Sequence, residues 1–216
     1  MRVLVIGANG LTGRRTVQFL KEGPHEPVAM IRDPKQTTTF DKMEVDTVVA
    51  DLEEPLDPAL DGIDAVIFAA GSGSKTGPDK TLAVDRDGAV RSIAAVEAAG
   101  IDRYVMLSAM RADPASEGHP ISHYLQAKGI ADEHLRRSQL AYTVVRPGRL
   151  TNDPGTGKVS LASRLKPGGS NSIPRDDVAA VMAACLDRPS THRASFDILE
   201  GDTPIDEALA TVEADG

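Results

Sequence analysis

The amino-acid sequence predicts an α/β fold with a doubly wound parallel sheet. Short apolar runs rich in Val and Ile alternate along the chain with longer helical patterns, and these runs are near-continuously hydrophobic. Continuous apolar strands are typical of a sheet with helices on both faces, and alternation of strand and helix favours parallel pairing with right-handed crossovers. The chain of 216 residues is long enough for one well-buried domain.

The expected elements follow one another in a regular order. Strands are expected over 2–7, 27–32, 46–52, 64–70, 103–109 and 142–148, and helices over 11–23, 80–99 and 121–138. After Pro147 the pattern loosens, because 151–172 is rich in Gly, Ser and Pro, which predicts a loop with a short strand. A helix over 174–187, a strand over 195–201 and a helix after Pro204 complete the chain. We see no internal repeat and no clear linker, so we expect one domain over 1–216, with 151–216 as a small C-terminal elaboration.

The composition argues against several classes of protein. The formal net charge of −8 disfavours a nucleic-acid binder, because no cluster of Lys and Arg offsets it, and it disfavours an anionic membrane surface as a partner. No apolar stretch approaches the roughly 20 residues that span a bilayer, and the N-terminus has no signal-peptide pattern. Cys185 is the single cysteine, and no His, Asp or Glu set has metal-ligand spacing. We expect a cytoplasmic protein with no metal site.

A glycine-rich segment joins the first expected strand to the first expected helix. Its glycines are spaced Gly-x-x-Gly-x-x-Gly. This spacing permits a tight turn, close approach of the backbone to a pyrophosphate and close packing of helix on strand, and the phosphates then meet the free N–H groups at the helix start. The segment therefore predicts a Rossmann-type dinucleotide site. The expected cofactor contacts are Gly7, Asn9, Gly10, Leu11, Thr12 and Gly13.

The end of the second strand is expected to select the nucleotide. An acidic side chain there accepts from the ribose 2′-OH of NAD, whereas an Arg meets the 2′-phosphate of NADP. Arg32 and Asp33 stand side by side, with Lys35 close behind, so both options are open. Arg32 falls at the strand tip, and Asp33 has an alternative role as a cap of the turn before Pro34. We favour NADP, with NAD as the alternative.

Two further strand ends are expected to complete the nucleotide site. Asp51 and Leu52 end the third strand and are placed to flank the adenine, with the Asp51 carboxylate accepting from its exocyclic amine. Ala69, Ala70 and Gly71 end the fourth strand and bring small residues against the adenosine side of the cofactor.

Tyr124 and Lys128 lie four residues apart in an expected helix, which places both side chains on one face, one turn apart. Ser108 ends the fifth strand. Together with the glycine segment, this order of motifs resembles the short-chain dehydrogenase/reductase superfamily. Residues 83–100 resemble the helix between its fourth and fifth strands, with Asp85 where an Asn is usual.

The resemblance extends from the first strand to at least Gly148. Pro147 and Gly148 follow the sixth strand, where the superfamily has a segment against the nicotinamide. Within the superfamily the chain is most similar to the small atypical branch of NAD(P)-binding, epimerase-like proteins.

The resemblance implies an NADP-dependent oxidoreductase that transfers hydride to or from a small carbonyl or alcohol substrate. Tyr124 would exchange the proton, although a Tyr with an unperturbed pKa of ~10 is a poor base at pH 7. Lys128 would favour the phenolate through its charge and would be able to donate to the nicotinamide ribose, while Ser108 would stabilise the substrate oxygen. Asp85 would alter the titration of its neighbours, which puts catalytic efficiency in doubt. Tyr124, Lys128, Pro147 and Gly148 are also expected as cofactor contacts.

Two other functions stay open. The first is a non-catalytic NAD(P)-binding sensor or regulator; the second, ranked lowest, is a nucleotide-sugar epimerase or dehydratase, for which few residues remain after Gly148. Loops 109–120 and 151–172 are expected to form the pocket of a small-molecule substrate. Arg111 and Arg149 either meet an anionic substrate or are ordinary loop charges, and we favour the latter. Both a monomer and a homodimer are compatible with the sequence.

Overall fold

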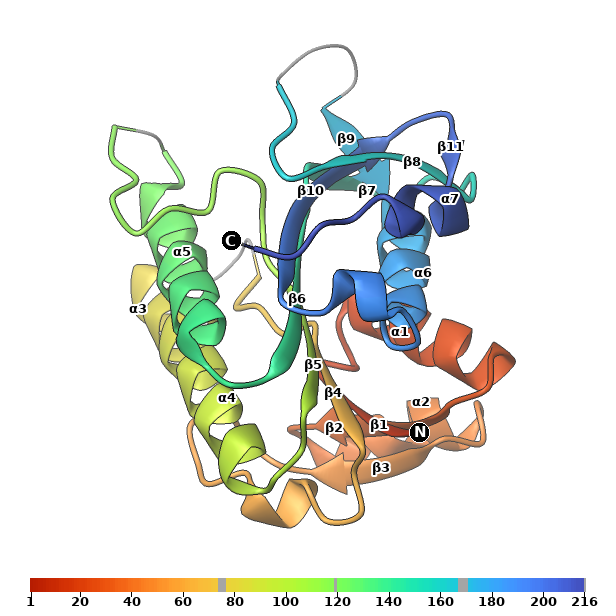
Figure 1. Ribbon diagram of the computed structural model, residues 1–216. Coiled ribbons are helices and arrows are strands. Elements are labelled where there is room, and N and C mark those ends of the chain that lie inside the picture. The colour runs from red at the N-terminus through yellow and green to blue at the C-terminus, as the bar shows by residue number, and fades with distance from the viewer. Residues whose placement is uncertain (74–76, 119, 167–170, 216) are drawn as a thin grey trace.

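A mostly parallel sheet runs through the middle of the molecule (Figure 1). The computed structural model describes residues 1–73, 77–118, 120–166 and 171–215. The strands of the described chain are β1 (Arg2–Ile6), β2 (Glu26–Ile31), β3 (Asp46–Val49), β4 (Ala65–Phe68), β5 (Arg103–Leu107), β6 (Ala141–Pro147), β7 (Arg149–Thr151), β8 (Lys158–Ala162), β9 (Ser172–Pro174), β10 (Ala194–Glu200) and β11 (Thr203–Pro204). The α-helices are α1 (Leu11–Glu22), α2 (Thr37–Asp41), α3 (Pro78–Lys80), α4 (Ala89–Ala98), α5 (Ser122–Arg137), α6 (Arg175–Cys185) and α7 (Ile205–Ala210).

The order of the main sheet is β11-β8-β10-β6-β5-β4-β1-β2-β3. The seven strands from β10 to β3 in this order pair in parallel. Beyond β10, β8 and β11 add an antiparallel edge. The chain winds outward in both directions from the middle of the sheet, so β1 and β4 lie side by side where the winding reverses. In open α/β sheets the crevice beyond the carboxyl ends of such a strand pair is the usual ligand site.

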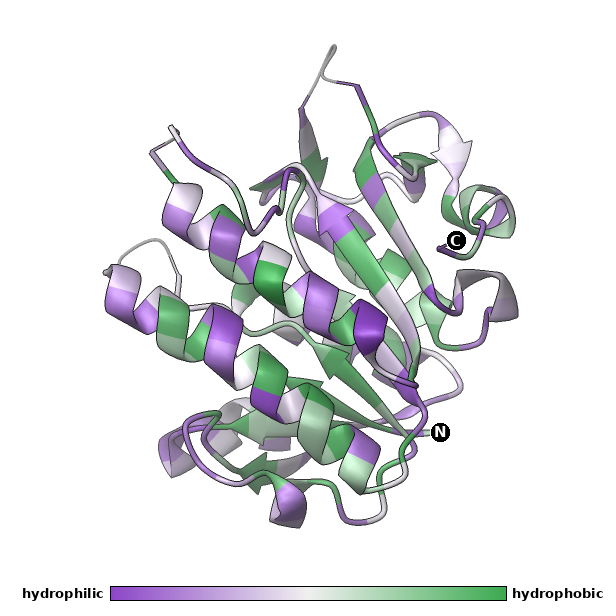
Figure 2. Cartoon of the chain, turned by 60° about the vertical axis from the view of Figure 1, so that its left-hand side comes forward, coloured by the Kyte–Doolittle hydropathy of each residue, from purple (hydrophilic) through white to green (hydrophobic). Residues whose placement is uncertain are grey.

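Helices cover both faces of the sheet, with α1 and α6 on one side and α3, α4 and α5 on the other (Figure 1). Successive residues of β1 point to opposite faces, and each joins a different core. Val5 packs in the cluster that includes Val17 of α1 and Met182 of α6, whereas Leu4 packs in the cluster that includes Ile93 of α4 and Leu135 of α5. Figure 2 shows largely hydrophobic strands behind α4 and α5. Burial on both faces explains the continuous apolar strands of the sequence.

The predicted fold class is confirmed, and so are the six strands expected before residue 150. The third, fourth and fifth strands end two or three residues earlier than predicted, at Val49, Phe68 and Leu107. The early ends leave Asp51, Ala69 and Ser108 outside the regular sheet, at its carboxyl edge.

The predicted helix over 80–99 is three consecutive segments: α3, a π-helix Thr81–Gly88, and α4. The expected loop over 151–172 contains more regular structure than predicted, because β8 joins the main sheet and β7 pairs in parallel with β9. Within the two expected pocket loops, positions 119 and 167–170 lie outside the described residues. Among the described helices, none combines the length and apolar character that a membrane crossing requires.

Candidate cofactor and catalytic site

The glycine segment packs tightly against the ends of β1 and β4. Gly7 has a φ of +82°, a conformation that glycine adopts readily, and a Cβ there would lie 2.5 Å from backbone atoms of Ala70. A Cβ on Gly13 would collide with the carbonyl oxygen of Gly7. Close packing of α1 on these strands therefore requires both glycines.

The start of α1 offers free backbone donors. Gly10 is the N-cap residue, and no side chain caps the helix. The N–H of Gly10 donates to the carbonyl of Gly7 at 2.9 Å, which closes the turn. The first N–H groups of the following helix turn lack helical acceptors and carry the positive end of the helix dipole. This arrangement suits a pyrophosphate.

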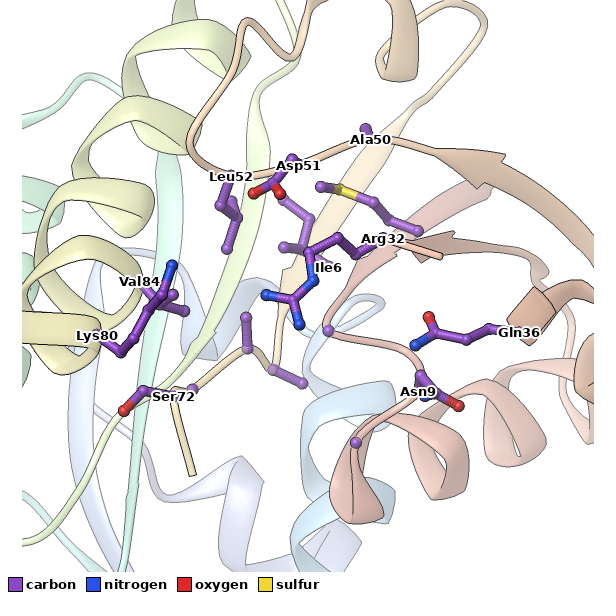
Figure 3. A pocket seen from close by; sticks show the side chains of 16 residues that line it. Ile6, Asn9, Arg32, Gln36, Ala50, Asp51, Leu52, Ser72, Lys80 and Val84 are labelled. Carbon is purple, nitrogen blue, oxygen red and sulfur yellow. The ribbon is translucent and has the colours of Figure 1, made fainter. Parts of the chain in front are cut away.

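A cavity of about 430 Å³ opens beside the glycine segment, and we name it the glycine-loop cavity (Figure 3). Nine of the residues predicted to bind the cofactor line it: Gly7, Asn9, Gly10, Arg32, Asp51, Leu52, Ala69, Ala70 and Gly71. Its lining also includes residues that sequence reasoning missed: Ile6, Met30, Gln36, Ala50, Ser72, Lys80 and Val84. Ile6, Met30 and Ala50 lie next to predicted site residues or strand ends, so their place in the wall could have been predicted from the sequence. No feature of the sequence indicated Gln36 or Lys80.

Arg32 and Asp33 point to different places. The Arg32 guanidinium extends into the glycine-loop cavity (Figure 3). The Asp33 carboxylate instead caps the turn Pro34–Gln36 and accepts the Lys35 N–H at 2.9 Å. Of the two adjacent charged residues, Arg32 is therefore the one that faces the cavity, and Asp33 does not.

Other predicted cofactor contacts lie outside the glycine-loop cavity. Leu11 is exposed and Thr12 is buried, and neither is part of the cavity wall. Gly13 serves the packing of α1 on Gly7. Pro147 and Gly148 line a second cavity together with Tyr124.

The second cavity has a volume of about 480 Å³, and we name it the tyrosine cavity. It brings Ser108, from the end of β5, together with Tyr124, from the first turn of α5. The other described residues that line it are Ala109, Met110, Arg111, Ile121, Leu125, Pro147, Gly148, Arg149, Leu150, Asn171 and Arg175. Loops 109–120 and 151–172, which were expected to form the substrate pocket, thus both contribute residues to the wall of the tyrosine cavity.

Lys128 lies between the two cavities and is almost completely buried. Its Nζ is 3.1 Å from Oδ1 of Asp85, and the exposed fractions of the two side chains are 4% and 0%. The ammonium also donates to the carbonyl oxygens of Ala70 and Leu107, each at 3.3 Å. The ammonium thus makes two hydrogen bonds to backbone carbonyls and one ion pair within the protein. The contact of Lys128 with a nicotinamide ribose stays a prediction.

The pKa of Tyr124 is raised above its ordinary value. Burial is the largest cause, and the charges of Asp85 and Asp132 act in the same direction, whereas Lys128 lowers the pKa. The Nζ of Lys128 lies 5.9 Å from the centre of the Tyr124 ring. The prediction that Lys128 favours the phenolate is correct for that one charge, but burial and two carboxylates outweigh it. Tyr124 is accordingly a neutral phenol at pH 7.

Asp85 acts on both neighbours, as predicted. Its charge raises the pKa of Tyr124 and that of Lys128, although burial of the ammonium opposes the latter rise. The π-helix Thr81–Gly88 holds Asp85, and the N–H of Ser72 donates to its Oδ2 at 2.9 Å. The carboxylate therefore ties the loop after β4 to α5.

A second buried ion pair stands behind Ser108, and sequence reasoning missed it. Arg146 of β6 donates from Nε to Oδ2 of Asp132 at 2.9 Å, and the side chains are 4% and 0% exposed. Burial raises the pKa of Asp132, while Arg146 and the Ser108 hydroxyl oppose that rise. The available signal was the spacing, since Asp132 follows Lys128 by one more helical turn.

Comparisons with known proteins identify the family of this chain. The family model described as NAD(P)H-binding matches residues 7–189. A Bacillus subtilis (strain 168) protein named "Uncharacterized sugar epimerase YhfK" is 45% identical over 214 residues, which cover 97% of this chain and 99% of that protein.

Two solved structures are similar over almost their whole length. "Putative NAD-dependent epimerase/dehydratase from Bacillus halodurans" has a TM-score of 0.93 and 45% identity, with 97% of this chain and 99% of that chain covered. The oxidoreductase ylbE from Lactococcus lactis has a TM-score of 0.86 and 26% identity, with 98% and 96% covered. The predicted relation to an atypical, epimerase-like NAD(P)-binding branch is confirmed, and this chain belongs to the NAD(P)H-binding family.

Proposed function

We propose that the protein is an NADP-dependent oxidoreductase that reduces a small carbonyl substrate, with Tyr124 as the proton donor. The observation that carries this proposal is the position of Lys128, which contacts Ala70 in the wall of the glycine-loop cavity and Leu107 next to Ser108 in the wall of the tyrosine cavity. A cofactor in the first cavity and a substrate in the second would meet beside this residue.

The protein's own groups would handle the proton and the oxygen. Tyr124 is a neutral phenol at pH 7, since an unperturbed Tyr has a pKa of ~10 and burial raises the pKa of Tyr124 further. It is therefore in the form that donates a proton to a carbonyl oxygen. Ser108 lies at the same cavity and is placed to hydrogen-bond that oxygen. Bound NADPH would supply the hydride. The protonated phenol is the form that reduction of a carbonyl requires.

The preference for NADP rests on Arg32. Its guanidinium extends into the glycine-loop cavity, and in the described chain it has no ion-pair partner, while Asp33 is occupied as a cap. A guanidinium suits a 2′-phosphate by charge and geometry. We expect NADPH to bind more tightly than NADH, and Arg32→Ser to remove most of this difference.

Two alternatives predict different results. A non-catalytic sensor would bind NADPH and turn nothing over. A sugar epimerase, as the names of the Bacillus relatives suggest, would use the cofactor without net consumption. The residues after Gly148 extend the main sheet through β8 and β10 instead of forming a separate substrate lobe, which favours a smaller substrate than a nucleotide sugar.

The decisive experiment is single-turnover oxidation of bound NADPH by a panel of carbonyl compounds, for the wild type and for Tyr124→Phe. We expect Tyr124→Phe to retain NADPH binding and to lose about a hundredfold or more in rate, as removal of a general acid does. Tyr104→Phe is the matched control, because its hydroxyl is buried against Ser92, away from both cavities. Equal rates for Tyr124→Phe and wild type would refute the role of Tyr124, and an inert panel would favour the sensor.

A further inference from the structure

Three arginines line the tyrosine cavity: Arg111, Arg149 and Arg175. No carboxylate from the described residues is part of its wall, although the chain as a whole carries a net charge of −8. The remaining wall is mostly apolar, with Met110, Leu125 and Leu150 among its residues. The cavity therefore combines an apolar interior with positive charge that the rest of the protein does not balance there.

Arg175 is half-buried, and its charge is not neutralised locally. Its Nη1 donates to the carbonyl oxygen of Thr151 at 3.0 Å and to Oδ1 of Asn152 at 2.8 Å, and both acceptors are neutral. Burial lowers its pKa, and the like charge of Arg15 lowers it further. The neighbouring Asp176 pairs with Arg15 at 2.6 Å. An anion in the cavity would relieve the unfavourable environment of this guanidinium.

The other two arginines have no carboxylate partner in the described chain either. Arg149 and Arg111 are both exposed at the cavity mouth. Arg111 has a φ of +65°, which is uncommon for a residue with a Cβ and is found disproportionately at ligand sites.

We propose that the tyrosine cavity takes a substrate with an anionic group, a carboxylate or a phosphate, attached to an apolar body that carries the reacting carbonyl. The proposal rests on the proposed function for the identity of the reacting group, but the anion site itself does not. Arg175 and Arg149 hold the anion, the apolar wall holds the body, and the carbonyl meets Ser108 and Tyr124. Charge-assisted, forked hydrogen bonds from Arg suit either oxyanion. This assignment departs from the sequence-based preference for Arg111 and Arg149 as ordinary loop charges.

The test compares pairs of substrates that share an apolar body and differ in one anionic group. 4-Carboxybenzaldehyde and its methyl ester serve for the carboxylate, and 4-formylphenyl phosphate and 4-methoxybenzaldehyde serve for the phosphate. We expect one charged member to have a KM about tenfold or more below its neutral partner, as a hydrogen bond to a charged group would give. Whichever pair shows the preference identifies the oxyanion. No preference in either pair would overturn the proposal.

The variants locate the effect. The hydrogen bonds of Arg149 to the described residues are made by its backbone, so Arg149→Gln is expected to leave the fold intact, and Arg175→Gln removes the half-buried charge. Each variant is expected to raise KM for the charged substrate about tenfold and to change KM for its neutral partner by much less. Arg137→Gln, on the exposed face of α5 beside Glu133, is the matched control and is expected to change neither. An equal effect of Arg137→Gln would overturn the proposal by showing that only the overall charge matters.

A binding measurement separates this proposal from the proposed reaction. Calorimetric titration of the NADPH-loaded protein with benzoate and phenyl phosphate, each against the neutral benzamide, requires no turnover. Selective binding of one anion, lost in Arg175→Gln, supports the anion site even if no carbonyl is reduced. Equal binding of anions and benzamide refutes the site even if neutral carbonyls are reduced.

Discussion

Asp85 is a buried charge that shifts the titration of the groups around it. Its carboxylate is fully buried against Lys128, and its charge raises the pKa of the nearby Tyr124 phenol. A neutral amide at this position would keep an acceptor for the Ser72 N–H and would lose the negative charge. The substitution Asp85→Asn therefore isolates the electrostatic part of its role.

We expect Asp85→Asn to lower the pKa of Tyr124. Reduction needs the protonated phenol, so its rate falls as the pH rises through that pKa; with the carboxylate gone, the fall begins at a lower pH than in the wild type. The measurement is the pH profile of the single-turnover rate. Asp87→Asn is the control, because Asp87 pairs with Arg86 away from Tyr124. A profile that moves to higher pH, or does not move, would contradict the account.

Single residues also show where sequence reasoning stops. The position of Arg32 at a cavity was predictable from the strand end, but only the fold shows that Asp33 turns back to cap the next residues. The spacing from Lys128 marked Asp132 alone. Nothing in the sequence pairs it with Arg146 of β6, because charged residues are usually exposed and the contact joins two separate elements. Arg175 follows β9, which pairs with β7, and this contact joins the two ends of the expected loop over 151–172.

At the scale of elements, helix α5 carries Tyr124 and Lys128, the two residues proposed for catalysis, and also supports the loop after β5. The N–H of Asp113 donates to the carbonyl of Leu125 at 3.1 Å, and the Gln126 amide donates to the carbonyl of Ser116 at 2.7 Å. Gly129 permits this approach, since a Cβ there would lie only 2.5 Å from the nitrogen of Pro114. The close packing of the loop after β5 on α5 therefore requires a residue without a side chain at position 129.

Gly129→Ala tests this contact by the sign of its effect. In an ordinary helix interior this change stabilises by about 1 kcal/mol. Here the added methyl would clash with backbone atoms of Asp113 and Pro114, which cannot move away by changing a side-chain rotamer. We therefore expect a loss of about 1–3 kcal/mol in the free energy of unfolding, measured with denaturant. We also expect a raised KM with little change in NADPH affinity, because Met110 and Arg111 belong to the displaced loop. Stabilisation would show that the loop adjusts without cost.

The buried pair of Asp132 and Arg146 joins α5 to β6 beneath the tyrosine cavity. Removal of one partner leaves a buried charge without compensation, so Arg146→Met is expected to cost about 3–5 kcal/mol of unfolding free energy. The double variant with Asp132→Leu is expected to recover most of that loss, because an apolar pair replaces the ionic one. Arg137→Met, which breaks an exposed pair on the same helix, is expected to change stability by less than about 1 kcal/mol. A double variant no more stable than Arg146→Met would show that the ionic pair itself is required.

At the scale of the whole molecule, the two cavities come from different stretches of the chain. The described residues that line the glycine-loop cavity all lie between Ile6 and Val84, and those that line the tyrosine cavity lie between Ser108 and Arg175. One sheet nevertheless carries both cavities, because β5 and β6 continue it from β4 without interruption. The sequence predicted this arrangement well, because apolar strands and helix periods are local properties. The shapes of the two cavities depend on which loops meet at the sheet edge, and those contacts are not local.

The shared sheet leads to a prediction about ligand binding and unfolding. If residues 1–216 are one cooperative domain, NADPH in the glycine-loop cavity stabilises the tyrosine cavity as well, and the whole chain unfolds in one transition. At about 100 times its Kd a ligand adds about 2.7 kcal/mol, which for a chain of this size raises Tm by about 5–10 °C. Thermal unfolding followed by far-UV circular dichroism and by calorimetry is expected to give coincident curves that shift together with NADPH and less with NADH at the same concentration. A curve with two steps, of which NADPH shifts only one, would show that the C-terminal part folds independently, because binding energy reaches only the segments that unfold together with the cofactor site.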